Sequence, residues 1–306
     1  MENVGVLSNA LTGYEFSAVY NMLSLGIASM LFTSLFLWVA RDRVLPKYRM
    51  AVMVSATVTS IAAYHYFRMF DSFSHAYGMN ETTAAATAKG VEAAVKSGLA
   101  ADSPEAAAAG VQAALQIGAA NYNVGYRYID WFLTVPLLLV ELVAVLGLAK
   151  AISSSLLKRL VPAAAAMIIL GYPGDAGITI LGIKGDGFAS EAAVWGLLST
   201  IPFLYIMYVL WIEMKKSLET QSPRVRSLFQ TLRVLLIATW GVYPITFILA
   251  MQTESNVPTA SEFVAREIGY SIADILAKCL FGLLIFAIAR IKSAEESKEH
   301  AAAEGH

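Results

Sequence analysis

The sequence has few charges and almost no cysteine. Only 15% of its 306 residues are Asp, Glu, Lys or Arg, whereas 57% are hydrophobic and the mean hydropathy is +0.59. A soluble domain is about a quarter charged, and so large an excess of apolar residues cannot be buried inside one soluble globule of this size. The single Cys279 excludes an internal disulfide, and the net charge of −1 offers nucleic acid no electrostatic footprint. The composition argues against a soluble enzyme and a disulfide scaffold, and favours a membrane protein.

Seven segments are long and apolar enough to cross a membrane as helices, which takes about 20 residues each. The sequence predicts them at residues 18–40, 48–70, 126–148, 156–181, 192–213, 228–251 and 263–291. We expect an interruption of the fourth at Gly171-Tyr172-Pro173-Gly174. The first 15 residues have neither a basic start nor a small-residue cleavage site, so we expect no removable signal peptide. The predicted fold is an all-α membrane protein, with a seven-helix bundle over residues 1–292 and a tail over 293–306.

Positive charges gather in alternate loops. One set of loops, together with the C-terminal segment, holds Arg41, Arg43, Lys47, Arg49, Lys150, Lys158, Arg159, Lys215, Lys216, Arg224, Arg226, Arg290, Lys292 and Lys298. Since Lys and Arg favour the cytoplasmic side, this pattern places the N-terminus outside and the C-terminus in the cytoplasm. An odd number of helices agrees with that orientation. We therefore expect a multi-pass protein of the cell membrane.

The loop at residues 79–120, between the second and third spans, is rich in alanine. Its Asp102-Ser103-Pro104-Glu105 stretch is typical of a helix start, with Ser103 as the cap, Pro104 in the first turn and Glu105 near the positive helix end. We expect a short helical hairpin in this outer loop, with Gly98 or Gly110 as weak points. The hairpin is either a solvated flap, or a subunit contact or lid over the outer opening.

Ionisable side chains inside membrane spans are costly, so each is a functional candidate. They cluster in three of the seven spans: His65 in the second, Arg127, Asp130 and Glu141 in the third, and Asp274 and Lys278 in the last. Such clustering indicates one buried polar site rather than scattered anchors at the membrane edge.

The last span places a carboxylate beside its buried lysine. Asp274 and Lys278 are four residues apart, so they share a helix face at roughly 6 Å. Together with Asp130 they could form only a static salt-bridge network that ties helices together. Glu141 weighs against that alternative, because it has no obvious cationic neighbour and an unpaired carboxyl in apolar surroundings stays protonated at neutral pH. A carboxyl of this kind suits a proton donor.

The third span carries its polar residues on one face. Arg127, Asp130 and Thr134 follow three-and-four spacing, and Glu141 lies eleven residues beyond Asp130. Eleven residues are three helical turns plus roughly 20°, so the two carboxylates point the same way, about 16 Å apart along the helix. Asp130 is on the outer side and Glu141 on the inner side. One carboxylate on either side of a central lysine is what vectorial proton movement requires.

At these residues the chain resembles the microbial rhodopsins, seven-helix proteins that carry retinal on a lysine. The matching segments are Arg-Tyr-Ile-Asp-Trp-Phe-Leu-Thr-Val-Pro-Leu-Leu at 127–138, Trp-Gly-Val-Tyr-Pro at 240–244, and the stretch from Asp274 to Lys278. They occur in the family's order, and the resemblance covers nearly all seven spans. Within the family, the chain is similar to the proteorhodopsin and xanthorhodopsin group of outward proton pumps, which carry Asp, Thr and Glu at the places of Asp130, Thr134 and Glu141. Chloride pumps lack the first carboxylate and sodium pumps have Asn, Asp and Gln there, and neither pattern is present.

The resemblance implies roles for the residues around the lysine. Lys278 would carry all-trans retinal as a protonated Schiff base. Asp130 would be its primary counterion and the proton acceptor, tuned by His65 as in the related pumps. Asp274 would be the second counterion. A positive charge buried in the membrane requires such negative partners.

The resemblance also implies a path on either side of the lysine. Arg127 would close the outer side and Glu141 would return a proton from the cytoplasm, so the chain would be a light-driven outward proton pump, a transporter rather than an enzyme. One alternative is a photosensor that signals through a partner protein, although sensors of the family often lack the donor carboxyl. Another is a retinal-free seven-helix transporter or receptor, which the pairing of Lys278 with Asp274 argues against.

Aromatic residues of several spans complete the implied retinal pocket. The resemblance implies that four residues sandwich the polyene, with two tyrosines nearby: Trp131, Trp240, Tyr243 and Pro244, then Tyr205 and Tyr270. Without the resemblance, the same set would be interpreted as ordinary helix packing. Leu138 stands where the group has Leu in green-absorbing forms and Gln in blue-absorbing ones, so we expect green absorption.

Gly196 stands where xanthorhodopsin-like pumps have glycine, whereas many proteorhodopsins have a bulky aromatic residue there. In that group the glycine opens a window onto the retinal ring, against which a carotenoid antenna can lie. The alternative is a small residue that permits close helix packing.

The other expected partners are the lipid bilayer and further copies of the chain in a trimer or pentamer, as in family members. We expect no metal site.

Overall fold

The chain folds into long helices joined by short connections. The computed structural model describes residues 11–78, 81–185, 187–245 and 259–304, and it has no strand within these residues. Seven helical segments are long and apolar enough to cross a membrane: α1 (Gly13–Ala40), α2 (Pro46–Tyr77), α5 (Gly125–Leu146), α6 (Lys150–Asp175), α7 (Glu191–Tyr208) with η3 (Val209–Glu213), α9 (Pro223–Trp240), and the continuous α11 (Ala260–Asp274), η4 (Ile275–Leu280) and α12 (Phe281–Glu304). The predicted all-α membrane fold is confirmed.

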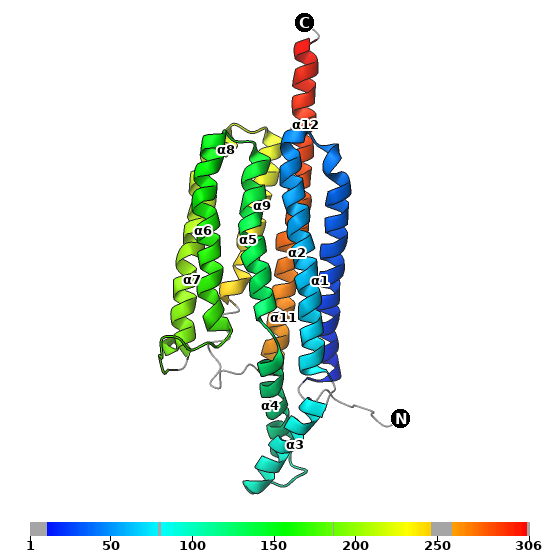
Figure 1. The fold of residues 1–306 in the computed structure, drawn as a ribbon, viewed down its shortest axis with the longest axis vertical. Helices are drawn as coiled ribbons and strands as arrows, with labels where there is room; N and C mark the ends of the chain where they lie inside the picture. The colour runs from blue at the N-terminus through cyan, green and yellow to red at the C-terminus, as the bar shows by residue number, and fades with distance from the viewer. Residues whose placement is uncertain (1–10, 79–80, 186, 246–258, 305–306) are drawn as a thin grey trace.

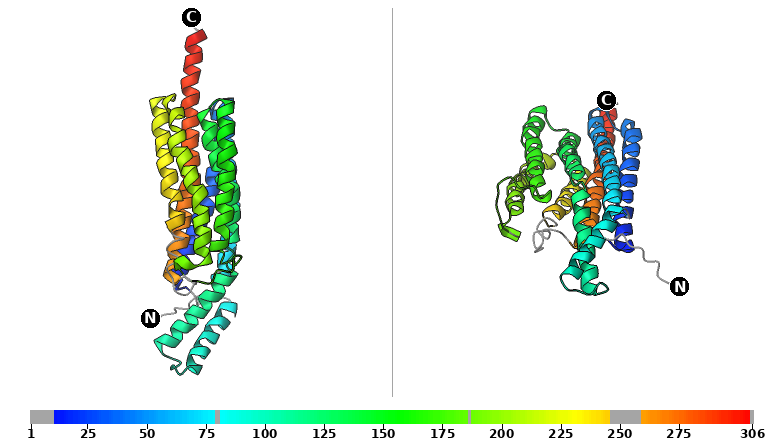
Figure 2. Two further views of the ribbon diagram at one scale, coloured as in Figure 1. Left: turned by 90° about the vertical axis from the view of Figure 1, so that its left-hand side faces the viewer. Right: turned by 60° about the horizontal axis from the view of Figure 1, so that its bottom comes forward.

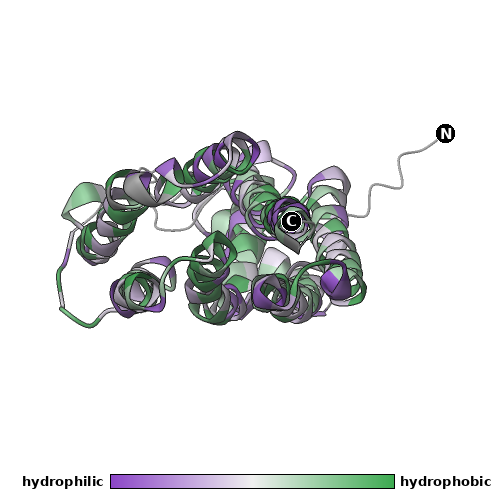
Figure 3. Ribbon diagram, turned by 90° about the horizontal axis from the view of Figure 1, so that it is seen from above, coloured by the Kyte–Doolittle hydropathy of each residue, from purple (hydrophilic) through white to green (hydrophobic). Residues whose placement is uncertain are grey.

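The seven segments lie side by side and form one bundle (Figure 1). Shorter elements connect them: η1 (Arg41–Arg43), α3 (Glu81–Lys96), α4 (Pro104–Asn121), η2 (Gly187–Ala189) and α8 (Lys215–Glu219). Helices α3 and α4 project from one end of the bundle and the last turns of α12 from the other, as two further views also show (Figure 2). Seen from above, the bundle has an elongated cross-section, with α6 and α7 at one end and α1 at the other (Figure 3).

Helix α6 differs from the prediction. It is not interrupted at residues 171–174, but runs from Lys150 through Gly171 and Pro173 to its end at Asp175. Proline and glycine are tolerated in membrane helices when neighbouring helices pack closely around them. A Cβ on Gly171 would lie 3.2 Å from the Ser199 hydroxyl of α7, so this glycine permits a close helix contact. The Gly-Tyr-Pro-Gly stretch therefore marks a packing site near a helix end.

The alanine-rich loop contains the two helices α3 and α4. As predicted, Ser103 caps α4, and its hydroxyl accepts a hydrogen bond from the amide of Ala106 (3.2 Å). Gly98 lies in the turn between the helices with φ of +101°, a conformation that favours glycine. Gly110 is not a weak point, because it lies within α4 at a contact where a Cβ would come within 2.9 Å of α3.

Aromatic rings join this outer extension to the bundle. The rings of Phe73, Tyr77, Tyr122 and Phe263 have centroids 4.6–6.5 Å apart. Gly118 of α4 lies against the Tyr77 ring, where a Cβ would come within 2.4 Å of it. The extension is therefore packed on the bundle through the end of α4.

The end of the sixth predicted span and the predicted tail can be compared with the structure only in part. The last part of the sixth predicted span, at 246–251, lies outside the described residues, as do residues 305 and 306 of the predicted tail. Residues 293–304 continue the helix of α12.

Candidate functional site

Helix α5 turns its polar face into the bundle. Arg127, Asp130, Thr134 and Glu141 are each at most 2% exposed. The helix ends at Gly147, whose φ of +63° gives the left-handed conformation usual after a helix C-terminus. The face that the sequence predicts to be functional is therefore the buried face of α5.

Lys278 lies in η4, a π-helical segment between α11 and α12. Its ammonium nitrogen Nζ lies 2.6 Å from Oδ2 of Asp130 and 3.0 Å from Oδ1 of Asp274. All three side chains are at most 1% exposed. Single π-helical turns occur frequently at functional sites. The structure brings together the lysine and the two carboxylates that the sequence predicts to surround it.

The two carboxylates are held very differently. Asp274 accepts hydrogen bonds from three side chains besides its ion pair with the lysine: Trp131 (3.1 Å), Tyr66 (2.9 Å) and Tyr243 (2.6 Å). Within the described part of the chain, Asp130 bonds through its side chain to Lys278 alone, and its buried Oδ1 has no hydrogen-bond partner. Several donors stabilise a carboxylate in its charged form, whereas a buried oxygen without a donor is costly. Asp130 is therefore the carboxylate better prepared to take a proton.

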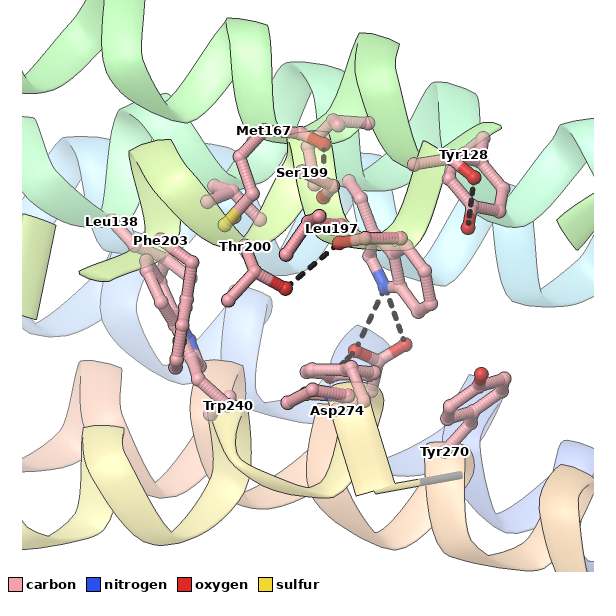
Figure 4. Close-up of a pocket in the computed structure, with 18 of the residues that line it drawn as sticks. Tyr128, Leu138, Met167, Leu197, Ser199, Thr200, Phe203, Trp240, Tyr270 and Asp274 are labelled. Carbon is pink, nitrogen blue, oxygen red and sulfur yellow. Dashed lines mark hydrogen bonds between the residues drawn. The ribbon is translucent and has the colours of Figure 1, made fainter. Parts of the chain in front are cut away.

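A cavity of about 290 Å³ extends from Lys278 across the bundle to α7. Its lining includes seven of the predicted residues: Trp131, Leu138, Gly196, Trp240, Tyr243, Pro244 and Tyr270. Figure 4 shows Leu197 and Thr200 on one side of the cavity and Asp274 and Tyr270 on the other. An amine beside two carboxylates at one end and mostly apolar walls elsewhere suit an apolar molecule that reacts with the amine.

Tyr205 does not line the cavity, contrary to the prediction. It belongs to α7, where its side chain is 37% exposed, and Phe203 contributes to the wall instead. Gly196, Thr200 and Phe203 follow the three-and-four spacing of one helix face. Tyr205 comes two residues later, which turns it about 200° away from Phe203. Phe203, and not the predicted neighbour Tyr205, is thus the aromatic residue that α7 contributes to the cavity wall.

The cavity opens toward the outside of the bundle beside Gly196. Phe188 and Leu197 also line it and are 69% and 67% exposed. In a membrane, this opening faces the lipid. Gly196 therefore lies in the part of the lining where the cavity opens.

A buried ion pair lies at the end of the site nearer α4. Arg127 donates two hydrogen bonds to Glu267 (3.1 and 2.7 Å), and both side chains are at most 2% exposed. The guanidinium also lies over the ring of Tyr270, 4.9 Å from its centroid. Tyr122 donates a further hydrogen bond to Glu267 (2.9 Å). Burial and the Glu267 carboxylate raise the pKa of the Tyr122 hydroxyl, so Tyr122 remains a donor.

The sequence reasoning missed Tyr66 as a site residue, and it placed Glu267 near the outer end of the last span without giving it a role. Glu267 precedes Asp274 by seven residues, two helical turns, and this spacing could have shown that they share a face. No spacing signal identifies Tyr66, because its role depends on a neighbouring helix. A Cβ on Gly26 of α1 would lie 2.3 Å from the Tyr66 ring, so this glycine makes room for it.

His65 lies on α2, 7% exposed, and its Nδ1 is 2.9 Å from the carbonyl of Ile61. It is near enough to Asp130 for an electrostatic interaction, but no hydrogen bond joins the two within the described residues. Thr134 donates to the backbone carbonyl of Asp130 (2.7 Å). The tuning of Asp130 by His65 therefore stays a prediction.

Glu141 is completely buried in the C-terminal half of α5. Neither of its carboxyl oxygens has a hydrogen-bond partner within the described residues. Burial without a partner strongly disfavours the charged form. Glu141 is therefore a carboxyl that holds a proton and is separated from Asp130 by about 16 Å of helix.

Comparisons with known proteins find relatives over nearly the whole chain. The model of the bacteriorhodopsin-like protein family matches residues 17–292. The green-light absorbing proteorhodopsin of the gamma-proteobacterium EBAC31A08 is 29% identical over 265 residues, which cover 86% of this chain and 82% of that protein. Bacteriorhodopsin of Halobacterium salinarum is 31% identical over 182 residues, 58% of this chain and 62% of that protein.

Solved structures agree with these relatives. The crystallographic structure of xanthorhodopsin, described as a light-driven ion pump with dual chromophore, is similar at a TM-score of 0.74 and 39% identity, and the match covers 94% of this chain and 98% of that one. A crystal structure of thermophilic rhodopsin is similar at a TM-score of 0.73 and 38% identity, with the same coverage.

Proposed function

Because the chain belongs to the family of bacteriorhodopsin-like proteins, we propose that it is a light-driven pump that moves protons out of the cell. Its seven helices would span the bilayer, with the protein acting as a transporter rather than an enzyme. The similar xanthorhodopsin is described as a light-driven ion pump. That the transported ion is a proton is our inference from the buried carboxyls of this chain.

The unequal surroundings of Asp130 and Asp274 carry this proposal. Asp274 is fixed as a charged partner of Lys278 by three uncharged donors, whereas Asp130 has one carboxylate oxygen free to accept a proton. When the Lys278 nitrogen releases its proton, Asp130 receives it. Asp274 retains its charge and keeps the site polarised.

The cavity and its reactive end fit retinal. Lys278 offers the amine, and the mostly apolar walls offer a site of suitable character for a polyene. When bound to Lys278, retinal supplies a light-driven change of shape that moves the nitrogen and its proton relative to the two carboxylates. Trp131 and Trp240 line the cavity and would restrict that movement. The resemblance implies green absorption from Leu138, and the place of Leu138 in the cavity lining supports that expectation.

The positions of the two proton carriers support outward transport. Asp130 lies one turn from Arg127 and its ion pair with Glu267, toward the end of the bundle that carries α3 and α4. Glu141 lies toward the opposite end and would return a proton to Lys278. If the basic loops lie in the cytoplasm, as the positive-inside pattern predicts, the N-terminus is outside and the proton leaves the cell.

We also propose that a carotenoid can serve as a second pigment at the opening beside Gly196. A flat, rigid polyene would lie against Phe188 and Leu197 on the lipid side. Light absorbed by an added hydroxylated carotenoid should then drive pumping in the natural protein, and Gly196→Trp should abolish that effect while leaving pumping by directly absorbed light. Antenna function that persists in Gly196→Trp would contradict the window.

The family resemblance further suggests a trimer or pentamer, which cross-linking in the membrane would test.

Expression with retinal followed by illumination in unbuffered medium tests the main proposal. We expect a green-absorbing protein and acidification of the medium that a protonophore abolishes, and Lys278→Ala should give no colour. Absence of retinal-dependent colour in the natural protein would contradict the proposal. A coloured protein with a slow photocycle and no pH change would identify a photosensor instead.

A further inference from the structure

Lys292 of α12 is a buried lysine outside the site described above. It follows the last predicted span directly, where a surface charge is expected, yet only 8% of it is exposed. Its ammonium donates hydrogen bonds to the backbone carbonyl of Leu146 (2.8 Å) and to Oε1 of Gln221 (2.6 Å). A buried ammonium is costly unless acceptors surround it, so these two bonds are what keep Lys292 inside.

The two acceptors of Lys292 belong to different helices. Leu146 is the last residue of α5, and the final carbonyls of a helix have no partner within it. Gln221 directly precedes Ser222, the residue that caps α9. One side chain of α12 therefore ties the C-terminus of α5 to the N-terminus of α9.

The same turn of α12 also contacts the α9 cap again and binds one further segment, the start of α2. Its contacts are Glu295 with the Ser222 hydroxyl (2.9 Å), Ser293 with the amide of Leu45 (2.9 Å), and Glu296 with Lys47 (2.6 Å) and with the Tyr48 hydroxyl. We call Lys292, Ser293, Glu295, Glu296 and these partners the inner latch. The inner latch thus fastens the ends of α2, α5 and α9 to α12, at the end of the bundle opposite α3 and α4 (Figure 1).

The inner latch lies between Glu141 and the end of the bundle. Leu146 is five residues beyond Glu141, which is about 7.5 Å along α5. Glu141 itself is fully buried. A proton that reaches Glu141 from the inner side therefore has to pass the residues that the latch holds together.

We propose that Lys292 is a positioning residue for proton uptake: it holds α9 against α5 and α12 and keeps Glu141 sealed from the inner water until the latch opens. This inference rests on the proposed function, in which Glu141 is the proton donor. The bond to Gln221 is the one that opens, because Gln221 is uncharged and partly exposed, whereas the Leu146 carbonyl is fixed in α5. Opening lets the start of α9 move away and admits water toward Glu141.

Flash-induced absorption changes test the effect on transport. Lys292→Met removes both hydrogen bonds of the ammonium, and we expect recovery of the resting state to become about 10- to 150-fold faster, the change that one hydrogen bond to a charged group produces in a rate. The earlier proton transfer to Asp130 should keep its rate. Lys292→Arg, which retains donors and charge, should restore slow recovery.

Lys298→Met is the matched control, because it removes a lysine charge from an exposed position on the same helix. It should leave both rates unchanged. In a Glu141→Gln background, Lys292→Met should no longer accelerate recovery, because the latch acts through the donor. Equal acceleration with and without Glu141 would contradict the proposal, as would an unchanged recovery rate in Lys292→Met.

The rate of amide hydrogen exchange in the dark measures how firmly the latch holds α9, independently of pumping. The first two turns of α9 should exchange faster in Lys292→Met than in the natural protein or in Lys298→Met. If Lys292→Met does not fold, Gln221→Leu tests the same bond from its other side and should show the same increase. Unchanged exchange in α9 would overturn the latch, whereas absence of retinal-dependent colour would overturn the proposed function and leave the exchange result interpretable.

Discussion

Asp130 and Asp274 both lie within 3.0 Å of the Lys278 nitrogen, but their other neighbours differ. Tyr66, Tyr243 and Trp131 supply donors to Asp274 alone. At the scale of single residues, the difference between a permanent counterion and a proton acceptor therefore comes from hydrogen bonding by uncharged side chains. Distance to the lysine alone would not separate the two roles.

Asp130→Asn should abolish pumping and shift the absorption of the retinal-bound protein to longer wavelength. The amide cannot accept the proton, and it removes a negative charge beside a buried positive one. Absorption spectra and light-induced pH changes of cell suspensions measure both effects. Pumping at the natural rate in Asp130→Asn would show that another group accepts the proton.

Glu141→Gln should slow recovery of the resting state by about 100-fold, the lower end of what a positioned general acid contributes. Its colour should stay unchanged, since Glu141 lies about 16 Å along the helix from Asp130. Flash photolysis and a static spectrum test the two parts separately. Recovery at the natural rate would exclude Glu141 as the donor.

The sequence could predict these residues because charges are rare in apolar spans and because one helix has a known period. Asp130, Glu141, Asp274 and Lys278 all follow from those two facts together with the family resemblance. The donors from other helices could not be predicted, because their positions depend on how the helices pack. Tyr66 reaches Asp274 from α2 only in the folded bundle.

At the scale of helices, rotation about the helix axis decides which side chains meet. Gly196, Thr200 and Phe203 share the cavity face of α7, whereas Tyr205, two residues beyond Phe203, is turned about 200° away from it. The Gly171–Pro173 stretch was predicted as a break because turn residues were expected to end a helix, whereas in α6 they permit close packing. Local sequence signals gave the helices and their caps but not the contacts between them.

The hydroxyl of Tyr122, at the end of α4, allows the contribution of the contact between α4 and α11 to the protein's stability to be measured. Tyr122→Phe removes the hydrogen bond to the buried Glu267 carboxylate and should destabilise the protein by about 1.5–3 kcal/mol, the value typical of a hydrogen bond to a charged group. Tyr77→Phe is the matched control, because Tyr77 lies in the same ring cluster and its hydroxyl makes no hydrogen bond within the described residues. Thermal unfolding in detergent followed by loss of colour compares the two. Equal destabilisation would mean that ring packing, not the bond to Glu267, holds α4 in place.

At the scale of the whole molecule, the bundle places Asp130 toward one end, beside Lys278, and Glu141 toward the other. In the proposed function these two carboxyls are the proton acceptor and the proton donor. The ion pair of Arg127 with Glu267 would close one end and the inner latch around Lys292 the other. The sequence predicted the seven spans and their orientation from hydropathy and loop charge. The resemblance predicted that Arg127 closes the outer side. Its partner Glu267 and the contacts of Lys292 could not be predicted, because each closure depends on residues of three or more separate segments.

The orientation can be tested by labelling from one side of the membrane. Glu105→Cys in α4 and Lys298→Cys in α12 introduce thiols at exposed positions near opposite ends of the bundle, and the natural Cys279 is buried. A membrane-impermeant maleimide should label Glu105→Cys in intact cells and Lys298→Cys only after lysis. The reverse pattern would contradict the positive-inside interpretation and the outward direction of transport.

Time-resolved infrared difference spectroscopy of the retinal-bound protein tests the central claim most directly, because it detects the carbonyl band of a carboxyl group as it gains a proton. We predict that illumination produces such a band, that Asp130→Asn removes it, and that Asp274→Glu leaves its frequency unchanged. A band that stays in Asp130→Asn or shifts in Asp274→Glu would contradict the assignment of Asp130 as the acceptor.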